Sequence, residues 1–159
     1  MKSGLKDPLL FFRLMDKLKN IVQSHLSEGI KLMDLIYNAR SDYVKITIDS
    51  QYDIQINQTT KIANQIRNDD DFLLLFPNGC RIEVGTPGVG TNLVEKFQYR
   101  KNIGRKIFIK YKNDDDIIAT DSVQLIDVEN DGLKVNKNDR DHLILFENII
   151  SAKVRVSFD

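Results

Sequence analysis

The spacing of apolar residues changes along the chain, and this change constrains the fold more than any other feature. Before residue 90, apolar residues recur every three or four positions in some stretches and every second position in others. From Lys106 onward only short alternating runs remain, separated by turn residues. The first spacing is typical of amphipathic helices and alternation is typical of half-buried strands. The sequence therefore predicts two domains, at residues 1–93 and 94–159.

Residues 1–93 show the order helix, strand, strand, helix, strand. Asp7 is expected to cap the first helix, with Pro8 at its first position and Gly29 just after its end. A second helix is expected to begin at a cap on Asn57 or Thr59. Strands are expected at residues 30–37, 43–49 and 80–85. The prediction is an α+β fold whose first domain is an α/β domain, with two helices on a three-stranded sheet.

Five alternating runs fill the C-terminal part, at residues 106–111, 117–128, 132–135, 142–146 and 151–158. So many short strands without a helical period predict a small closed β-barrel. Asn130, Asp131 and Gly132 lie between two of the runs and are typical of a tight hairpin with positive φ. The same segment resembles a calcium-binding loop, but its twelfth position is Asn138 instead of a bidentate glutamate. We therefore expect a hairpin here.

The residue inventory argues against several kinds of catalytic or metal site. The chain has one cysteine, Cys80, and two histidines, which are too few for a disulfide or for a zinc site built from Cys and His. Cys80 is expected in the core. The aspartate runs 69–71 and 114–116 are expected to be solvated loops. We accordingly expect no metal, no cofactor and no catalytic residue.

A glycine-rich stretch at residues 81–93 raises the question of nucleotide binding. Gly85 and Gly90 match the start of a phosphate-binding loop, but Thr91 and Asn92 stand where its lysine and hydroxyl are needed. We expect a turn instead, in which Pro87 fixes φ and Gly88 permits a positive φ.

Two features bear on the cellular compartment. The apolar stretch at residues 9–12 is too short for a signal peptide or a membrane span, because Arg13 interrupts it. The single cysteine suits a reducing compartment. We expect a cytoplasmic protein with no membrane contact.

Positive charge is concentrated in one segment although the whole chain carries 23 basic and 23 acidic residues. Residues 96–112 hold seven basic residues, no acidic residue and four interleaved aromatic residues, whereas residues 113–159 hold eleven acids and five bases. Such a segment can contact RNA phosphates, and an exposed tyrosine can stack on a base. The alternative to RNA binding is that these lysines simply form the solvent-exposed face of a strand. The candidate RNA-binding residues are Lys96, Tyr99, Arg100, Lys101, Arg105, Lys106 and Lys110.

Four motifs in order resemble those of the ribosome maturation factor family called RimP. Residues 82–88, IEVGTPG, resemble the Leu-Glu-Val-Ser-Ser-Pro-Gly signature that ends the first domain of that family. Residues 43–49, 56–66 and 146–154 resemble its second strand, its second helix and its closing Asn-Ile-x-x-Ala element. The residues that form the family-motif turn are Glu83, Gly85, Thr86, Pro87 and Gly88.

The resemblance implies an N-terminal α/β domain, a C-terminal barrel of the SH3-like kind and no catalysis. We also expect a monomer without a cofactor. It also implies transient binding to ribosomal RNA and to a small-subunit ribosomal protein during assembly of the small (30S) subunit, with no DNA partner. Gly90, Thr91 and Asn92 depart from the Asp-Arg-Pro run that many members have, so a contact made by that arginine does not carry over. Two other functions stay open: a small NTPase, and an adaptor that binds protein only through the barrel.

Overall fold

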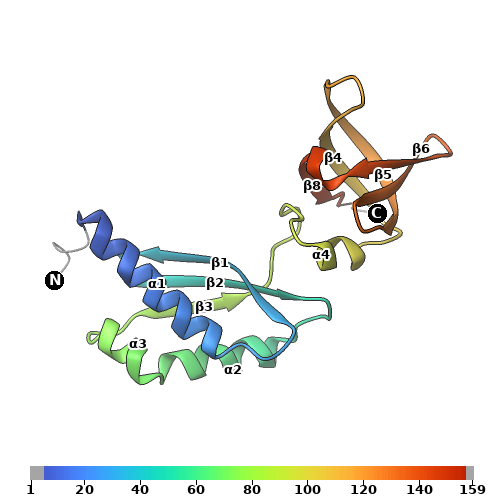
Figure 1. Cartoon of the computed structure of the whole chain (residues 1–159). Helices are drawn as coiled ribbons and strands as arrows, with labels where there is room; N and C mark the ends of the chain where they lie inside the picture. The colour runs from blue at the N-terminus through green and yellow to red at the C-terminus, as the bar shows by residue number, and fades with distance from the viewer. Residues whose placement is uncertain (1–5, 157–159) are drawn as a thin grey trace. The chain divides into compact units, whose positions relative to one another are not determined.

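The chain folds into two compact units, Met1–Pro87 and Gly88–Asp159, which are described one at a time below. The structure is a computed structural model that describes residues 6–156 (Figure 1). Both helices and strands occur, and the strands form two separate sheets. The expected α+β class is therefore confirmed.

The N-terminal unit places three helices against a three-stranded sheet (Figure 1). The sheet order is β1-β2-β3, with an antiparallel β1–β2 pair and a parallel β2–β3 pair. A parallel pair needs a crossover, which the two helices between β2 and β3 provide. The elements are α1 (Pro8–Ser24), β1 (Ile30–Asn38), β2 (Tyr43–Ser50), α2 (Ile56–Arg67), α3 (Asp70–Leu75) and β3 (Arg81–Gly85).

One core holds this unit together. Val44, Ile46 and Ile48 point from β2 to the same side of the sheet and are fully buried. Apolar residues from α1, α2 and α3 pack on them, so all three helices contribute to covering that face. Cys80 packs against the same core, as expected from the sequence.

The ends of α1 confirm one expected cap and correct the other. Asp7 caps the helix, since its carboxylate accepts a hydrogen bond from the backbone N–H of Leu9 at 2.9 Å, and Pro8 is the first helical residue. The helix ends at Ser24, with His25 as its C-cap, so the expectation for Gly29 was wrong. Gly29 lies in the turn before β1 with a φ of +86°.

The start of α2 also differs from expectation. The capping residue is Gln55, whose backbone N–H bonds to the side chain of Gln58 at 2.8 Å. Asn57 and Thr59, the expected caps, lie inside the helix. Glutamine is an uncommon cap, so the usual preference for Asn and Thr placed the start too late.

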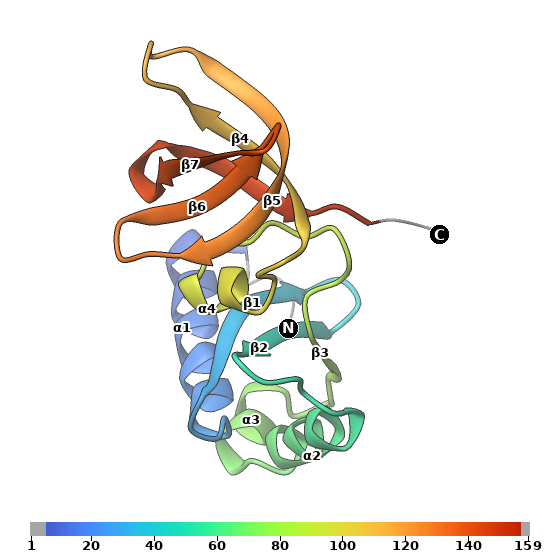
Figure 2. The same cartoon turned by 90° about the vertical axis from the view of Figure 1, so that its right-hand side faces the viewer.

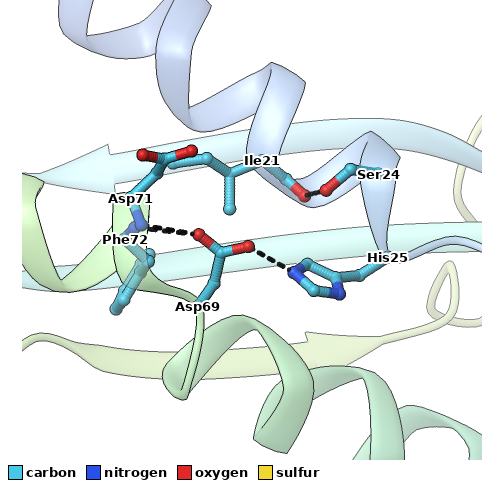
Figure 3. Close-up of polar contacts among 6 residues, drawn as sticks. All are labelled: Ile21, Ser24, His25, Asp69, Asp71 and Phe72. Atoms are coloured by element: carbon cyan, nitrogen blue, oxygen red, sulfur yellow. Dashed lines mark hydrogen bonds and ion pairs between the residues drawn. The ribbon is translucent and has the colours of Figure 1, made fainter.

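The aspartate run 69–71 was expected to be a solvated loop, but it forms the start of the helix α3. Asp69 caps it, accepting hydrogen bonds from the backbone N–H groups of Asp71 and Phe72 at 2.9 and 3.1 Å. The other carboxylate oxygen of Asp69 lies 2.7 Å from Nε2 of His25 (Figure 3). This hydrogen bond lowers the pKa of Asp69, and burial opposes it. One carboxylate therefore joins the end of α1 to the start of α3.

The C-terminal unit is a curled, five-stranded antiparallel sheet (Figure 2). The strand order is β7-β6-β5-β4-β8, and all five strands expected in this part are confirmed. A short helix, α4, precedes the sheet, and this helix was not predicted from the sequence. The elements are α4 (Lys96–Arg100), β4 (Lys106–Lys112), β5 (Ile118–Val128), β6 (Gly132–Lys137), β7 (Arg140–Leu145), a 3₁₀ turn (Phe146–Asn148) and β8 (Ile149–Val154).

A closed barrel is not found. In the described residues, β7 and β8 are the two edge strands of the sheet and are not paired with each other. The inward side chains of the strands and of Tyr99 nevertheless form one core. The last expected strand was to reach residue 158, of which residues 157 and 158 lie outside the described part.

Gly132 begins β6 for a reason that the hairpin pattern did not reveal. The β5–β6 hairpin is present, but none of residues 130–132 has a positive φ, so that expectation was wrong. A Cβ atom on Gly132 would lie 2.3 Å from the backbone oxygen of Ile144, on the neighbouring strand. Positive φ occurs instead at Asn138 and Asp139, which form the two-residue turn between β6 and β7.

Replacing Asp69 tests the link between α1 and α3. We expect Asp69→Ala to lower the free energy of unfolding of the N-terminal unit by about 1–2 kcal/mol, since a helix cap is lost. Because the folded pKa of Asp69 is lowered from 3.8, its contribution is lost as the pH falls through that lowered value. Urea unfolding followed by circular dichroism measures the change. Asp70→Ala is the control, and equal losses in the two variants would contradict the assignment.

Replacing Gly132 tests the close approach of β6 to β7. We expect Gly132→Ala to destabilise the C-terminal unit by about 2 kcal/mol or more, since backbone must move to admit the methyl group. Gly85→Ala is the matched control, because a Cβ atom there meets nothing within 4 Å. Thermal unfolding measures both, and a Gly132→Ala protein as stable as the control would show that the contact is unimportant.

Candidate nucleic-acid interface

The basic segment 96–112 covers α4, the following loop and β4. Gln98 stabilises the start of α4, since its side-chain oxygen accepts hydrogen bonds from the backbone N–H groups of Val94 and Glu95 at 2.9 and 3.0 Å. The candidate residues therefore lie on a helix, a loop and a strand, and the position of each residue on its element decides whether its side chain reaches solvent.

Tyr99 is buried, with 3% of its surface exposed. Its ring packs beside Phe146, with 6.0 Å between ring centroids, and its hydroxyl donates to the backbone oxygen of Leu93 at 3.0 Å. Burial raises the pKa of Tyr99 to about 12. The ring has no free face for a base, so Tyr99 belongs to the core and not to an interface.

Lys96 is held by contacts inside the C-terminal unit. Its ammonium donates to the backbone oxygen of Asn130 at 2.8 Å and lies 5.3 Å from the centroid of the Phe146 ring. Arg100 and Lys101, at the end of α4, are exposed. Arg105 is exposed too, and its guanidinium lies 3.4 Å from the side-chain oxygen of Asn102.

Alternation in β4 brings the remaining candidates together. Ile107 and Ile109 are fully buried in the core, so Lys106, Phe108 and Lys110 point outward. Lys112, the next outward residue, pairs with Asp116 at 3.4 Å. Phe108 is 41% exposed. The solvent-exposed face of this strand therefore carries an aromatic ring between two lysines.

The last strand, β8, and the residue that follows it add two cations that the sequence reasoning missed. Lys153 lies directly opposite Phe108 in the β4–β8 pair. The backbone N–H of Arg155 donates to the backbone oxygen of Lys106 at 2.9 Å, and its guanidinium lies 5.7 Å from the centroid of the Phe108 ring. The alternation of basic and apolar residues at 152–155 was a signal, but the pairing of the last strand with β4 was not readable from it. We call Lys106, Phe108, Lys110, Lys153 and Arg155 the basic face.

The neighbours of the basic face carry no negative charge on the β5 side. The residues of β5 opposite Lys106, Phe108 and Lys110 are uncharged, namely Gln124, Ser122 and Thr120. Among residues 6–156, no ion pair joins a lysine of the basic face to a carboxylate. Clustered cations without counter-charges produce a positive potential that attracts anions.

The family-motif turn straddles the two units. Glu83 is exposed on β3 and accepts a hydrogen bond from the hydroxyl of Tyr43, while Gly85 ends that strand opposite Thr47. Thr86 and Pro87 end the first unit. Glu83 and Gly85 thus belong to the end of a strand, Thr86 and Pro87 follow it without regular secondary structure, and a hydrogen-bonded turn begins only at Gly88.

The segment after the turn lies along β8. Gly88 does not have the positive φ expected from the sequence; Gly90 has it instead, at +81°. The backbone N–H and the hydroxyl of Thr91 both donate to the backbone oxygen of Gly88, at 3.2 and 2.6 Å. Asn92 then forms a bridge opposite Lys153. The segment that departs from the Asp-Arg-Pro run is thus placed next to the basic face.

Groups with chemical reactivity are sparse in the described part of the chain. Within residues 6–156, no three His, Cys, Asp or Glu side chains are grouped so that they could hold a metal ion. His25 is hydrogen-bonded to Asp69, as described above, and burial raises the pKa of Cys80 to about 11. None of the helices described is long and apolar enough to cross a membrane.

The chain is similar to curated ribosome maturation factors. No profile of a known protein family matches it. It is 24% identical over 160 residues to the ribosome maturation factor RimP of Christiangramia forsetii, which covers 91% of this chain and 99% of that protein. It is 27% identical over 106 residues to the protein of the same name from Prosthecochloris aestuarii, covering 63% of this chain and 59% of that protein.

Alkylation of Cys80 tests whether the thiol is a nucleophile. A pKa of about 11 in place of 9.0 leaves roughly a hundredfold less thiolate near neutral pH, so iodoacetamide should react correspondingly more slowly with the folded chain than with the chain in urea. Mass spectrometry of quenched samples measures the rate. Equal rates in the two states would mean that the folded protein exposes an ordinary thiol.

Proposed function

We propose that this chain is a ribosome maturation factor of the RimP kind. It assists assembly of the small (30S) ribosomal subunit by binding ribosomal RNA and a small-subunit ribosomal protein, without catalysis. The observation that carries this proposal is the similarity to the Christiangramia forsetii protein, which extends over almost the whole of both chains. The motifs at residues 43–49, 56–66, 82–88 and 146–154 support it, because they occur in the order found in that family.

The C-terminal unit supports the part of the proposal that concerns RNA. Arg105, Lys106 and Lys110 are exposed cations on or next to one strand, and the outward residues opposite the two lysines on β5 are uncharged. Arg100 and Lys101 add positive charge at the end of α4. We also propose that this unit is of the SH3-like kind, on the strength of its curled antiparallel sheet and single core.

The mechanism is transient occupancy of the maturing subunit. The factor holds a local RNA arrangement until later components dock, and then leaves as a monomer in the cytoplasm. Contacts made mostly through phosphates suit this role, because their affinity falls steeply with salt and their dissociation is fast. Neither a metal nor a cofactor is part of this mechanism.

An adaptor that binds only protein is the second candidate. Exposed apolar side chains on the C-terminal unit favour it, since such side chains suit a protein contact. They are Ile117, Ile118, Leu143 and Ile150, which are 61%, 58%, 51% and 52% exposed. Binding through them would depend little on salt and would survive reversal of the basic residues.

Charge reversal on β4 and at the residue before it decides between the two candidates. We expect the variant with Arg105→Glu, Lys106→Glu and Lys110→Glu to lose association with small-subunit precursors by at least tenfold, since three phosphate contacts become repulsive. Sedimentation of tagged full-length protein with isolated small subunits, against full ribosomes, measures the association. Repeating it at several salt concentrations gives the salt dependence of binding.

A matched variant controls for total charge. Lys17→Glu, Lys19→Glu and Lys61→Glu change the net charge equally on exposed helix positions of the N-terminal unit. We expect this variant to sediment with small subunits as the wild type does. Undiminished association of the β4 variant would remove the RNA contact from the proposal and favour the adaptor.

A further inference from the structure

We propose that the basic face binds an unpaired stretch of RNA, with one base stacked on the ring of Phe108. The inference rests on the proposed function for the choice of RNA, and it adds the site, the residues and the kind of RNA. Phe108, Lys153 and Arg155 carry it, and the last two come from a part of the chain that the charge distribution of the sequence did not single out.

The exposure of Phe108 is the first observation. Phe108 is 41% exposed, so its ring offers a surface for a contact, and burial of an aromatic ring contributes strongly to binding. Phe108 is flanked two residues away on either side by Lys106 and Lys110, and opposite it by Lys153. An aromatic ring surrounded by ammonium groups suits a flat, electron-rich partner that carries negative charge nearby. An unpaired base with its phosphates has both properties.

The register of the strands places polar groups on either side of the ring. Ser122 of β5 and Lys153 of β8 both lie opposite Phe108, and Asn92 lies opposite Lys153. Residues directly opposite one another in antiparallel pairs have Cβ atoms about 4.5–5.5 Å apart and side chains on the same face. The row across the strands therefore consists of the Ser122 hydroxyl, the Phe108 ring, the Lys153 ammonium and the Asn92 amide. The hydroxyl and the amide can hydrogen-bond to base edges or to the 2′-hydroxyl, which distinguishes RNA from DNA.

Arg155 extends the stacking surface. Its guanidinium lies 5.7 Å from the centre of the Phe108 ring, within the range of a cation–π contact. Guanidinium planes also stack on bases. The arginine backbone is fixed by its hydrogen bond to Lys106, so the side chain starts from an ordered position. Phe108 and Arg155 together give room for a base and for the phosphate that follows it.

Single-stranded RNA fits these features better than a duplex or an acidic protein. In a duplex the bases are stacked on one another, so only phosphates would meet the face and the phenylalanine would have no partner. An acidic protein would satisfy the lysines but gives no reason for an aromatic residue in their midst. Both remain outcomes that the following experiment separates.

Substitution of Phe108 in the full chain tests the stacking. The probe is a fluorescent, unstructured RNA of about 12 nucleotides, with the same sequence as a duplex for comparison. We expect Phe108→Ala to weaken binding of the single strand by about fivefold to a hundredfold and to leave duplex binding unchanged, as measured by fluorescence anisotropy. Phe108→Tyr keeps the ring and should bind within twofold of the wild type. Circular dichroism melting checks that both variants fold.

The charged residues have their own control. Lys153→Gln should reduce the salt slope of single-strand binding by about 0.7, the value of one phosphate contact. Lys134→Gln is the matched variant, because Lys134 lies in the same sheet and already pairs with Asp141 at 3.7 Å. We expect its slope to equal that of the wild type.

Two results would overturn the inference. They are equal single-strand affinity of wild type and Phe108→Ala, and equal loss of affinity for single strand and duplex. If the first is accompanied by loss of small-subunit association in Phe108→Ala, the face is assigned to a protein. Failure of the proposed function looks different: wild-type protein would not sediment with small subunits, while its binding to the single strand would still depend on Phe108.

Discussion

The alternation of β4 is the constraint on which the C-terminal unit and its surface both depend. Ile107 and Ile109 are fully buried, and this burial fixes the register of β4 between β5 and β8. A shift of one residue would turn the lysines into the core and expose both isoleucines, which would cost several kcal/mol in apolar burial alone. The burial of the two isoleucines therefore determines which side chains of β4 face solvent. The positive surface exists because the core holds the strand in this one register.

The sequence predicted the helices and strands whose apolar residues recur with a clear period. It also argued against some kinds of site, because residues that those sites need are absent. All five strands of the C-terminal sheet, the β1–β2 hairpin and the cap at Asp7 follow from alternation or from a local side-chain preference. A phosphate-binding loop needs a lysine at the position that Thr91 occupies, so the sequence alone argues against nucleotide binding there. These features are local, so a reader of the sequence has all the information that determines them.

Other features depend on residues far apart in the chain and were missed. The need for glycine at position 132 comes from the backbone of Ile144, and the burial of Tyr99 comes from Phe146. Asp69 seemed to belong to a charged loop because its partner, His25, is 44 residues away. Only the residues of the basic face that lie on β4 could be found from the sequence. Lys153 was missed because it lies opposite Phe108 through a strand pairing that no local pattern encodes.

The hydrogen bond from the backbone N–H of Leu93 to the backbone oxygen of Ala152, 2.7 Å long, has a consequence for how the protein behaves in a crowded solution. An outermost strand with unsatisfied backbone groups invites another polypeptide to extend the sheet. On one side the chain blocks this by laying its own residues 92 and 93 against β8. On the other side β7 begins with exposed Arg140, Asp141 and His142, whose polar side chains disfavour such an addition. The sheet can therefore stay open and yet resist polymerising with its copies.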